Sequence, residues 1–192
     1  MDATVKAISA HGLREISLAD VAQQAGLTRG AILYYYEDLD ALLVEAHRAG
    51  VERFCEQRDA AVAQISEPQL QLSTAIRAGL PSGPDDALMR LLYEFDVLMG
   101  NSTLHDELVE KLYLRQLASY TGILQNGVAA GVFAPLLPLD TLAMNLVALE
   151  DAYGLHIVGG NSLITVAIAE RAICAVADNL GAPTTLGATV AQ

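Results

Sequence analysis

The sequence has no tryptophan, and aromatic residues make up only 5% of its 192 residues. Alanine, leucine and valine dominate the apolar fraction of 53%, which favours packed helices over a β-sandwich. No apolar run reaches the roughly 18 residues that a membrane helix needs, because Asp140, Asn145 and Glu150 interrupt the most apolar stretch. A basic-then-apolar signal peptide is also missing. We therefore expect an all-α protein with no membrane segment.

Cysteine is scarce, and the two present, Cys55 and Cys174, form no CxxC motif. Free thiols in a reducing cytoplasm are the simpler interpretation. The sequence also lacks a nucleophile motif and a glycine-rich phosphate loop, so we expect no enzyme activity and no cofactor. The four histidines show no metal-ligand spacing and predict no metal site; they are His11, His47, His105 and His156.

Basic residues are few, with 11 Lys and Arg against 23 Asp and Glu, and the net charge is −12. Residues 1–50 follow the same trend, with four basic and seven acidic residues. Neither part of the chain has the composition of a general polyanion binder. Any DNA binding must therefore depend on a local patch.

Glycines and prolines divide the chain into segments that are almost all helical in pattern. About nine helices and no convincing strand are expected. Their predicted ranges are 2–10, 17–25, 28–36, 38–65, 69–79, 85–99, 103–130, 139–158 and 162–180. We expect a helix-turn-helix domain over 1–45 and a larger helical domain for ligand binding and dimerisation over 46–192.

The first three helices carry clear start and stop signals. Ser17 and Asp20 form a capping-box-like start, and Gly26 supplies a left-handed turn. Thr28 is placed to cap the next helix, and Asp38 to cap the fourth. Two short helices joined by a glycine turn, with a third packed on them, form the helix-turn-helix arrangement.

In that arrangement the second helix of the pair lies in the major groove, so its exposed face must be small or polar. Thr28 can donate to a phosphate, and Arg29 can reach phosphate or guanine. Gly30 lets the backbone approach DNA, and Ala31 can contact a thymine methyl. The candidate DNA-binding residues are Ser17, Thr28, Arg29, Gly30, Ala31, Tyr34 and Tyr35.

Helical spacing places Tyr35 toward the core, and Tyr34 and Tyr36 outward. The competing interpretation of residues 28–36 is an ordinary surface helix of an all-α protein. For Ser17, helix capping is the first role and phosphate contact the second.

Over three helices the residue types and spacings resemble the DNA-binding domain of the TetR family of bacterial repressors. The matching segments are Ser17-Leu-Ala-Asp-Val-Ala22, Ala25-Gly-Leu-Thr-Arg-Gly-Ala-Ile-Leu-Tyr-Tyr-Tyr36 and Ala41-Leu-Leu43. The resemblance covers residues 2–43, about a fifth of the chain. It implies a homodimer formed by the last two helices, a palindromic double-stranded DNA operator and a small-molecule effector.

Three departures from the family pattern weaken the expected DNA affinity. Leu33 replaces a tyrosine, and Leu39 replaces a lysine that contacts phosphate in the family. Met1 falls inside the first helix, so the usual basic lead-in is missing. Together with the acidic N-terminal third, these departures keep open a rival function, a ligand-sensing or protein-interaction module of the same fold without DNA binding.

A ligand site is expected in the C-terminal domain, between apolar faces that carry a few polar groups. The same residues could equally be core, and Asn145 could instead face solvent or a dimer interface. The candidate ligand-binding residues are Tyr93, Asp96, Met99, Tyr113, Tyr120, Asn145, Leu149 and Tyr153.

The dimer interface is expected on helices 139–158 and 162–180, the second beginning at Ser162. One stripe of that helix is mostly small or β-branched, which allows close helix packing. Its members are Ile164, Ala167, Ile168, Arg171, Ala172 and Ala175. Arg171 would need an acidic partner there, and Glu170 and Asp151 of the other subunit are the candidates.

Overall fold

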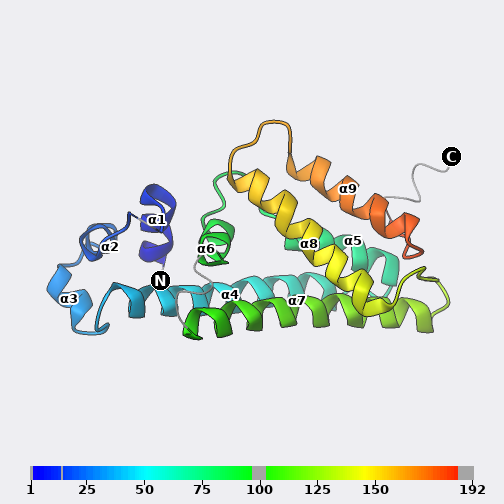
Figure 1. The fold of residues 1–192 in the computed structure, drawn as a ribbon, viewed down its shortest axis with the longest axis horizontal. Helices are drawn as coiled ribbons and strands as arrows, with labels where there is room; N and C mark the ends of the chain where they lie inside the picture. The colour runs from blue at the N-terminus through cyan, green and yellow to red at the C-terminus, as the bar shows by residue number, and fades with distance from the viewer. Residues whose placement is uncertain (1, 14, 97–102, 186–192) are drawn as a thin grey trace. The chain divides into compact units, whose positions relative to one another are not determined.

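The computed structural model describes residues 2–13, 15–96 and 103–185, and these residues form nine helices and no strand (Figure 1). The all-α prediction is confirmed. The helices are α1 (Asp2–His11), α2 (Leu18–Ala25), α3 (Arg29–Leu33), α4 (Leu39–Ala63), α5 (Pro68–Gly79), α6 (Ala87–Asp96), α7 (Thr103–Ala129), α8 (Leu139–Val158) and α9 (Val166–Asn179).

Two helix boundaries among the described residues differ from the predicted ones by three residues or more. Helix α3 ends at Leu33 rather than at residue 36, because the chain turns there toward the start of α4. Helix α9 begins at Val166, and its cap is Thr165, whose Oγ1 accepts from the Ile168 N–H at 3.3 Å. Ser162 was the wrong cap, since the Asn161 side chain holds the Leu163 N–H and keeps that segment in a turn.

The chain contains two compact units. The N-terminal unit comprises the described residues of 1–54 and 85–111, and the C-terminal unit comprises those of 55–84 and 112–185. Helix α6 and the first part of α7 therefore belong to the same unit as the N-terminal helices. The predicted boundary at residue 45 was based on the motif alone and left these two segments out.

In the N-terminal unit, α1 packs against α2 and α6, and α2 packs against α3. Apolar residues from each helix meet in one core, which includes Ile8, Val21, Ile32, Leu42 and Phe95. This core is what holds the short helix α3, because five residues alone form no stable helix in water.

In the C-terminal unit, α8 and α9 run side by side, and α5 contacts both (Figure 1). Their shared core is fully buried and includes Leu72, Ile76, Leu142, Leu146 and Ile173. Within the described part of the chain, no helix has the length and apolar character needed to cross a membrane.

Candidate DNA-binding and effector sites

Helix α2 is fixed at both ends by the signals that the sequence contains. The Ser17 side chain accepts from the Asp20 N–H, and the Asp20 carboxylate accepts from the Ser17 N–H at 2.8 Å, so the capping box is complete. The hydrogen bonds from Ser17 lower the pKa of Asp20. Gly26 ends the helix in the left-handed conformation at φ 66°. The side chain of Ser17 is therefore engaged in capping.

Helix α3 begins at a true cap, because Thr28 Oγ1 accepts from the Ala31 N–H at 3.2 Å. Thr28, Arg29 and Gly30 are exposed, whereas Ile32 is buried in the N-terminal core. The small and polar residues of this helix thus face outward, as a groove-reading helix requires.

The three tyrosines are arranged differently from the prediction. Tyr34 and Tyr35 are exposed, at 82% and 77%, and their rings pack edge to face at 5.0 Å. Tyr36 is the inward residue and packs on the N-terminal core. The correction follows from spacing: Tyr36 lies one turn beyond the buried Ile32, and its N–H donates to the Ile32 carbonyl.

Positive charge around α3 is confined to one residue. Between residues 15 and 47, Arg29 is the only Lys or Arg, while Glu37, Asp38 and Asp40 follow it closely. Asp38 is committed to capping α4, with its Oδ1 accepting from the Ala41 N–H at 2.8 Å. Leu39 is half-buried against the N-terminal core and supplies no charge.

A buried histidine lies in the core of the N-terminal unit. His47 stacks on Phe95 with ring centroids 4.0 Å apart, and His105 meets the edge of Phe95 at 5.0 Å. Neither ring nitrogen of His47 has a hydrogen-bond partner among the described residues. Burial, with a smaller effect from the nearby His105, lowers the pKa of His47 to about 4. His47 is therefore neutral at physiological pH.

The expected ligand-binding residues are divided between the two units. Tyr93 is buried and Asp96 half-buried in the N-terminal unit, and Met99 falls outside the described residues. In the C-terminal unit Asn145 is exposed. The half-buried residues that pack on the C-terminal core are Tyr113, Leu149 and Tyr153.

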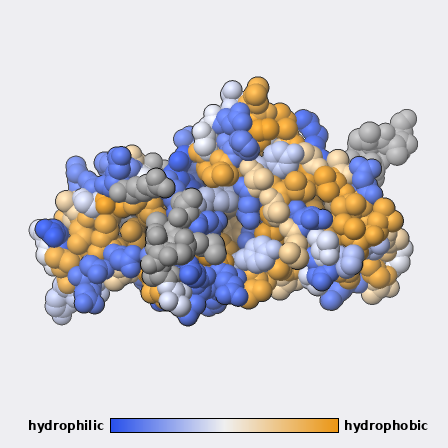
Figure 2. Space-filling model, in the orientation of Figure 1, coloured by the Kyte–Doolittle hydropathy of each residue, from blue (hydrophilic) through white to orange (hydrophobic). Residues whose placement is uncertain are grey.

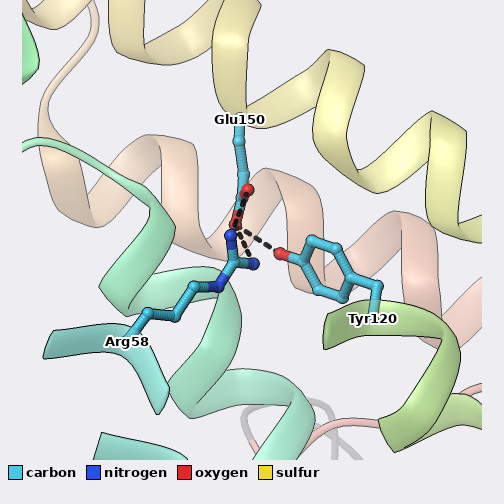
Figure 3. Close-up of polar contacts among 3 residues, drawn as sticks. All are labelled: Arg58, Tyr120 and Glu150. Atoms are coloured by element: carbon cyan, nitrogen blue, oxygen red, sulfur yellow. Dashed lines mark hydrogen bonds and ion pairs between the residues drawn. The ribbon is translucent and has the colours of Figure 1, made fainter. Parts of the chain in front are cut away.

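The remaining candidate, Tyr120, belongs to a fully buried polar cluster in the C-terminal unit (Figure 3). Arg58 of α4 reaches Glu150 of α8 through two bonds, Nη1 to Oε2 at 3.3 Å and Nη2 to Oε1 at 3.1 Å. The Tyr120 hydroxyl of α7 donates to Glu150 Oε1, and the Arg58 guanidinium lies over the Tyr120 ring at 4.5 Å. We call these three residues the Arg58 cluster.

Burial and the charge of Arg58 have opposite effects on the pKa values of the carboxyl groups in and beside this cluster. Burial raises the pKa of Glu150 to about 7, although Arg58 and the Tyr120 hydrogen bond oppose the shift. Burial likewise raises the pKa of the neighbouring Asp151 to about 6, again opposed by Arg58. Burial also keeps Tyr120 protonated by raising its pKa well above the usual value. One guanidinium thus faces two carboxylates that are only partly stabilised as anions.

Comparison with known proteins bears first on the N-terminal helices. Residues 1–46 match the family model of bacterial regulatory proteins, tetR family. The N-terminal helices are those of a TetR-family helix-turn-helix domain.

Two curated Bacillus subtilis proteins are similar to this chain over about two thirds to three quarters of its length. The fatty acid metabolism regulator protein is 23% identical over 133 residues, which cover 68% of this chain and 67% of that protein. The HTH-type transcriptional regulator YfiR is 22% identical over 146 residues, covering 73% and 69%. The similarity therefore extends past the helix-turn-helix.

Solved structures share the whole fold. A transcription regulator of the TetR family from Haloarcula marismortui has a TM-score of 0.83 at 18% identity, covering 93% of this chain and 94% of its own. A regulator from Saccharomonospora viridis in complex with choline scores 0.85 at 20% identity, covering 92% of each chain. FadR from Bacillus subtilis in complex with stearoyl-CoA scores 0.68 at 16% identity, covering 90% and 92%.

Arg58 was not among the site residues predicted from the sequence. A signal was present: Arg58 falls one helical turn after Phe54 and one turn before Val62 on the apolar stripe of α4. A cation on a buried stripe requires a buried counter-ion. Glu150 was noted as a polar residue in an apolar helix, but the sequence does not indicate which cation it meets.

Large apolar side chains are exposed on the outward surface of α8 and α9 (Figure 2). Leu155 and Leu163 are 59% and 78% exposed, and Ile168 is also exposed. Four residues of the predicted dimer stripe lie on this side of α9, opposite its buried face at Ala169 and Ile173: Ala167, Ile168, Arg171 and Ala175. The other two differ from the prediction, because Ile164 precedes α9 and packs on the C-terminal core and Ala172 is half-buried. The exposed residues that make up what we call the outer face are Met144, Ala148, Ala152, Leu155, Ala167, Ile168, Arg171 and Ala175.

Proposed function

We propose that this chain is a homodimeric TetR-family repressor that binds a palindromic DNA operator and is released by a small-molecule effector. The observation that carries the DNA-binding part is the presentation of Thr28, Arg29 and Gly30 on a capped helix whose other side is anchored in the core. In a two-fold dimer, two such helices can enter successive major grooves about 34–36 Å apart.

Within this proposal the DNA-facing residues have separate roles. Arg29 reads guanine or holds a phosphate, and the Thr28 hydroxyl and backbone N–H groups contact phosphate. Tyr34 and Tyr35 are exposed enough to contact DNA as well. The side chain of Ser17 is held by Asp20, so its contribution to DNA binding is to fix α2.

Dimerisation through the outer face is supported by its composition. A surface on which large apolar side chains stand exposed is stabilised when a second copy covers it. Arg171 of the outer face has no ion pair among the described residues, and Asp151 on α8 makes no hydrogen bond among them. In a two-fold dimer, Arg171 would pair with the partner subunit's Asp151, and symmetry would form this pair twice.

Effector binding in the C-terminal unit is supported by the likeness to structures solved with choline and with stearoyl-CoA. An effector releases DNA only if it binds the DNA-free conformation more tightly than the DNA-bound one. The C-terminal unit includes α8 and α9, so an effector held there can alter the dimer contact directly.

The experiment that tests the proposal is titration of labelled DNA from upstream of the gene with the purified chain, followed by fluorescence anisotropy. Sequence-specific binding in excess of unlabelled random DNA supports the repressor. The rival, a sensing module without DNA binding, is favoured by the acidic residues around α3 and predicts no difference between upstream and random DNA.

A further inference from the structure

The Arg58 guanidinium is enclosed in the C-terminal unit but is not fully satisfied there. Its side chain is 2% exposed, and its Nη1 and Nη2 groups donate to Glu150. The Nε–H group is buried and has no acceptor among the described residues. A buried donor without an acceptor is costly, and in native proteins such a group generally has a water, ion or ligand as its partner.

Glu150 is a weak counter-ion for this guanidinium. Its bonds to Arg58, at 3.1 and 3.3 Å, are longer than the 2.7–2.9 Å typical of charge-assisted pairs. Because the pKa of Glu150 is about 7, close to half of the molecules at neutral pH carry a neutral carboxylic acid at this position. In those molecules Arg58 is a buried cation with no strong anion beside it, which is an unfavourable state.

From this geometry we propose that Arg58 is the recognition residue of the effector site, and that it binds a carboxylate carried by an apolar molecule. Glu150 takes up a proton from solvent and becomes a neutral hydrogen-bond donor. The ligand carboxylate accepts from this group and from the free Nε–H edge of Arg58. Tyr120 remains a neutral hydroxyl throughout. The inference rests on the proposed effector-binding role and adds its ligand class.

The residues around the Arg58 cluster are suited to binding an apolar carboxylate. The charged and titratable groups that act on Glu150 are Arg58 of α4, Tyr120 of α7 and Asp151 of α8. Gly79 of α5 lies directly against the Glu150 carboxylate. Most of the other buried residues of the C-terminal unit are aliphatic or aromatic, which suits the body of an amphipathic acid. Since the site is closed, the ligand must enter by separating helices that Arg58 and Glu150 hold together, which links binding to a change of conformation.

Binding of a carboxylate ligand should depend on pH, because it is linked to protonation of Glu150. The binding-competent form has Glu150 protonated, so the apparent affinity for a carboxylate follows the protonated fraction. With a pKa of about 7, that fraction falls from about nine-tenths at about pH 6 to about one-tenth at about pH 8. Affinity for the carboxylate should therefore weaken about tenfold over this range.

The experiment is calorimetric titration of the full chain, without DNA, with three matched probes kept below their micelle concentrations: decanoate, decanol and decyltrimethylammonium. We expect decanoate to bind best and to bind about tenfold more weakly at the higher pH. Preferential binding of the cation, equal binding of decanol, or a flat pH profile for decanoate would each overturn the proposal.

Three variants test whether decanoate binding and its pH dependence arise from the Arg58 cluster. Glu150→Gln should bind decanoate with no pH dependence and about twofold more tightly than wild type at pH 7, because its amide is always neutral. The double variant Arg58→Met/Glu150→Gln removes both charges together, which folded proteins tolerate, and should bind no decanoate. Asp59→Asn, an exposed neighbour on α4, is the matched control and should bind as wild type does.

Failure of decanoate to bind either wild type or Glu150→Gln overturns this inference. Decanoate binding by the folded double variant at wild-type affinity also overturns it, because recognition would then not need Arg58. The operator titration is independent: a chain that binds upstream DNA but ignores decanoate keeps the repressor function and loses only the ligand class.

Discussion

Gly79 of α5 lies directly against the carboxylate of Glu150 of α8, and a Cβ atom at position 79 would fall inside the van der Waals radii of that carboxylate. The glycine is not required by backbone conformation, since its φ is not in the left-handed region. It is required by space: α5 and α8 can enclose a buried acid only where one of them has no side chain.

Gly79→Ala should therefore destabilise the protein by about 1–3 kcal/mol, the usual range for forcing an extra group into a packed core. Gly122, within α7, is a matched control because a Cβ there would meet nothing within 4 Å. Gly122→Ala should instead stabilise by about 0.5–1 kcal/mol through helix propensity. Urea denaturation of both variants measures the difference, and an equal effect of the two substitutions would contradict the packing described here.

His47 should make the N-terminal unit sensitive to acid. Its folded pKa of about 4 is below the unfolded value of 6.5, so its contribution to stability is complete above pH 6.5 and is lost as pH falls through 4. The loss is on the order of 3 kcal/mol. His47→Leu should remove this loss, measured as the free energy of unfolding of variant and wild type at each pH.

The comparison between variant and wild type is needed because other groups act in the opposite direction. The raised pKa values of Glu150 and Asp151 contribute stability at low pH that is lost as pH rises through about 6 to 7. His11→Gln is the control, since His11 is exposed. If His47→Leu and His11→Gln shift the acid limb equally, burial of His47 is not its cause.

A charged substitution on the outer face should prevent dimerisation. Ile168→Glu would place an unpaired carboxylate in the dimer contact, and two-fold symmetry would place two of them close together. We expect this variant to sediment as a monomer, to keep its helical circular dichroism and to lose operator binding. Leu114→Glu, at a 55% exposed position of α7 outside the outer face, should stay dimeric. A dimeric Ile168→Glu would move the interface elsewhere.

The salt dependence of the DNA affinity should show that the protein neutralises few phosphates. Each neutralised phosphate contributes about −0.9 to the slope of log affinity against log salt. With Arg29 the only cation between residues 15 and 47, we expect a shallow slope. Leu39→Lys, whose stem can keep the half-buried position of Leu39, should steepen the slope by about one such unit. An unchanged slope in this variant would place the start of α4 away from the phosphates.

Much of the fold is encoded locally and was predictable from the sequence. Ser17 with Asp20, Thr28 and Asp38 each cap the helix that was expected of them, because capping depends on residues three apart. The errors arose where a competing cap lay nearby, as with Ser162 and Thr165, or where a helix ended early, as after Leu33.

The buried site was harder to predict because it depends on distant pairings. Arg58 and Glu150 are separated by 92 positions in the chain, and nothing local links them. A single sequence shows that each is a charged residue on an apolar helix face, but not that the two faces meet. Tyr120 was correctly placed among inward residues, yet its partner could be identified only from the fold.

In the proposed function, operator binding depends most directly on Arg29, the cation of α3. The decisive measurement is the affinity of wild type and of Arg29→Ala for upstream operator DNA, with Arg48→Ala, an exposed cation on α4 paired to Glu45, as the control. The account predicts that Arg29→Ala loses about 1–3 kcal/mol of specific binding, the value of one bidentate contact to guanine, and that Arg48→Ala loses far less. Wild-type affinity in Arg29→Ala would contradict the assignment of α3 as the recognition helix.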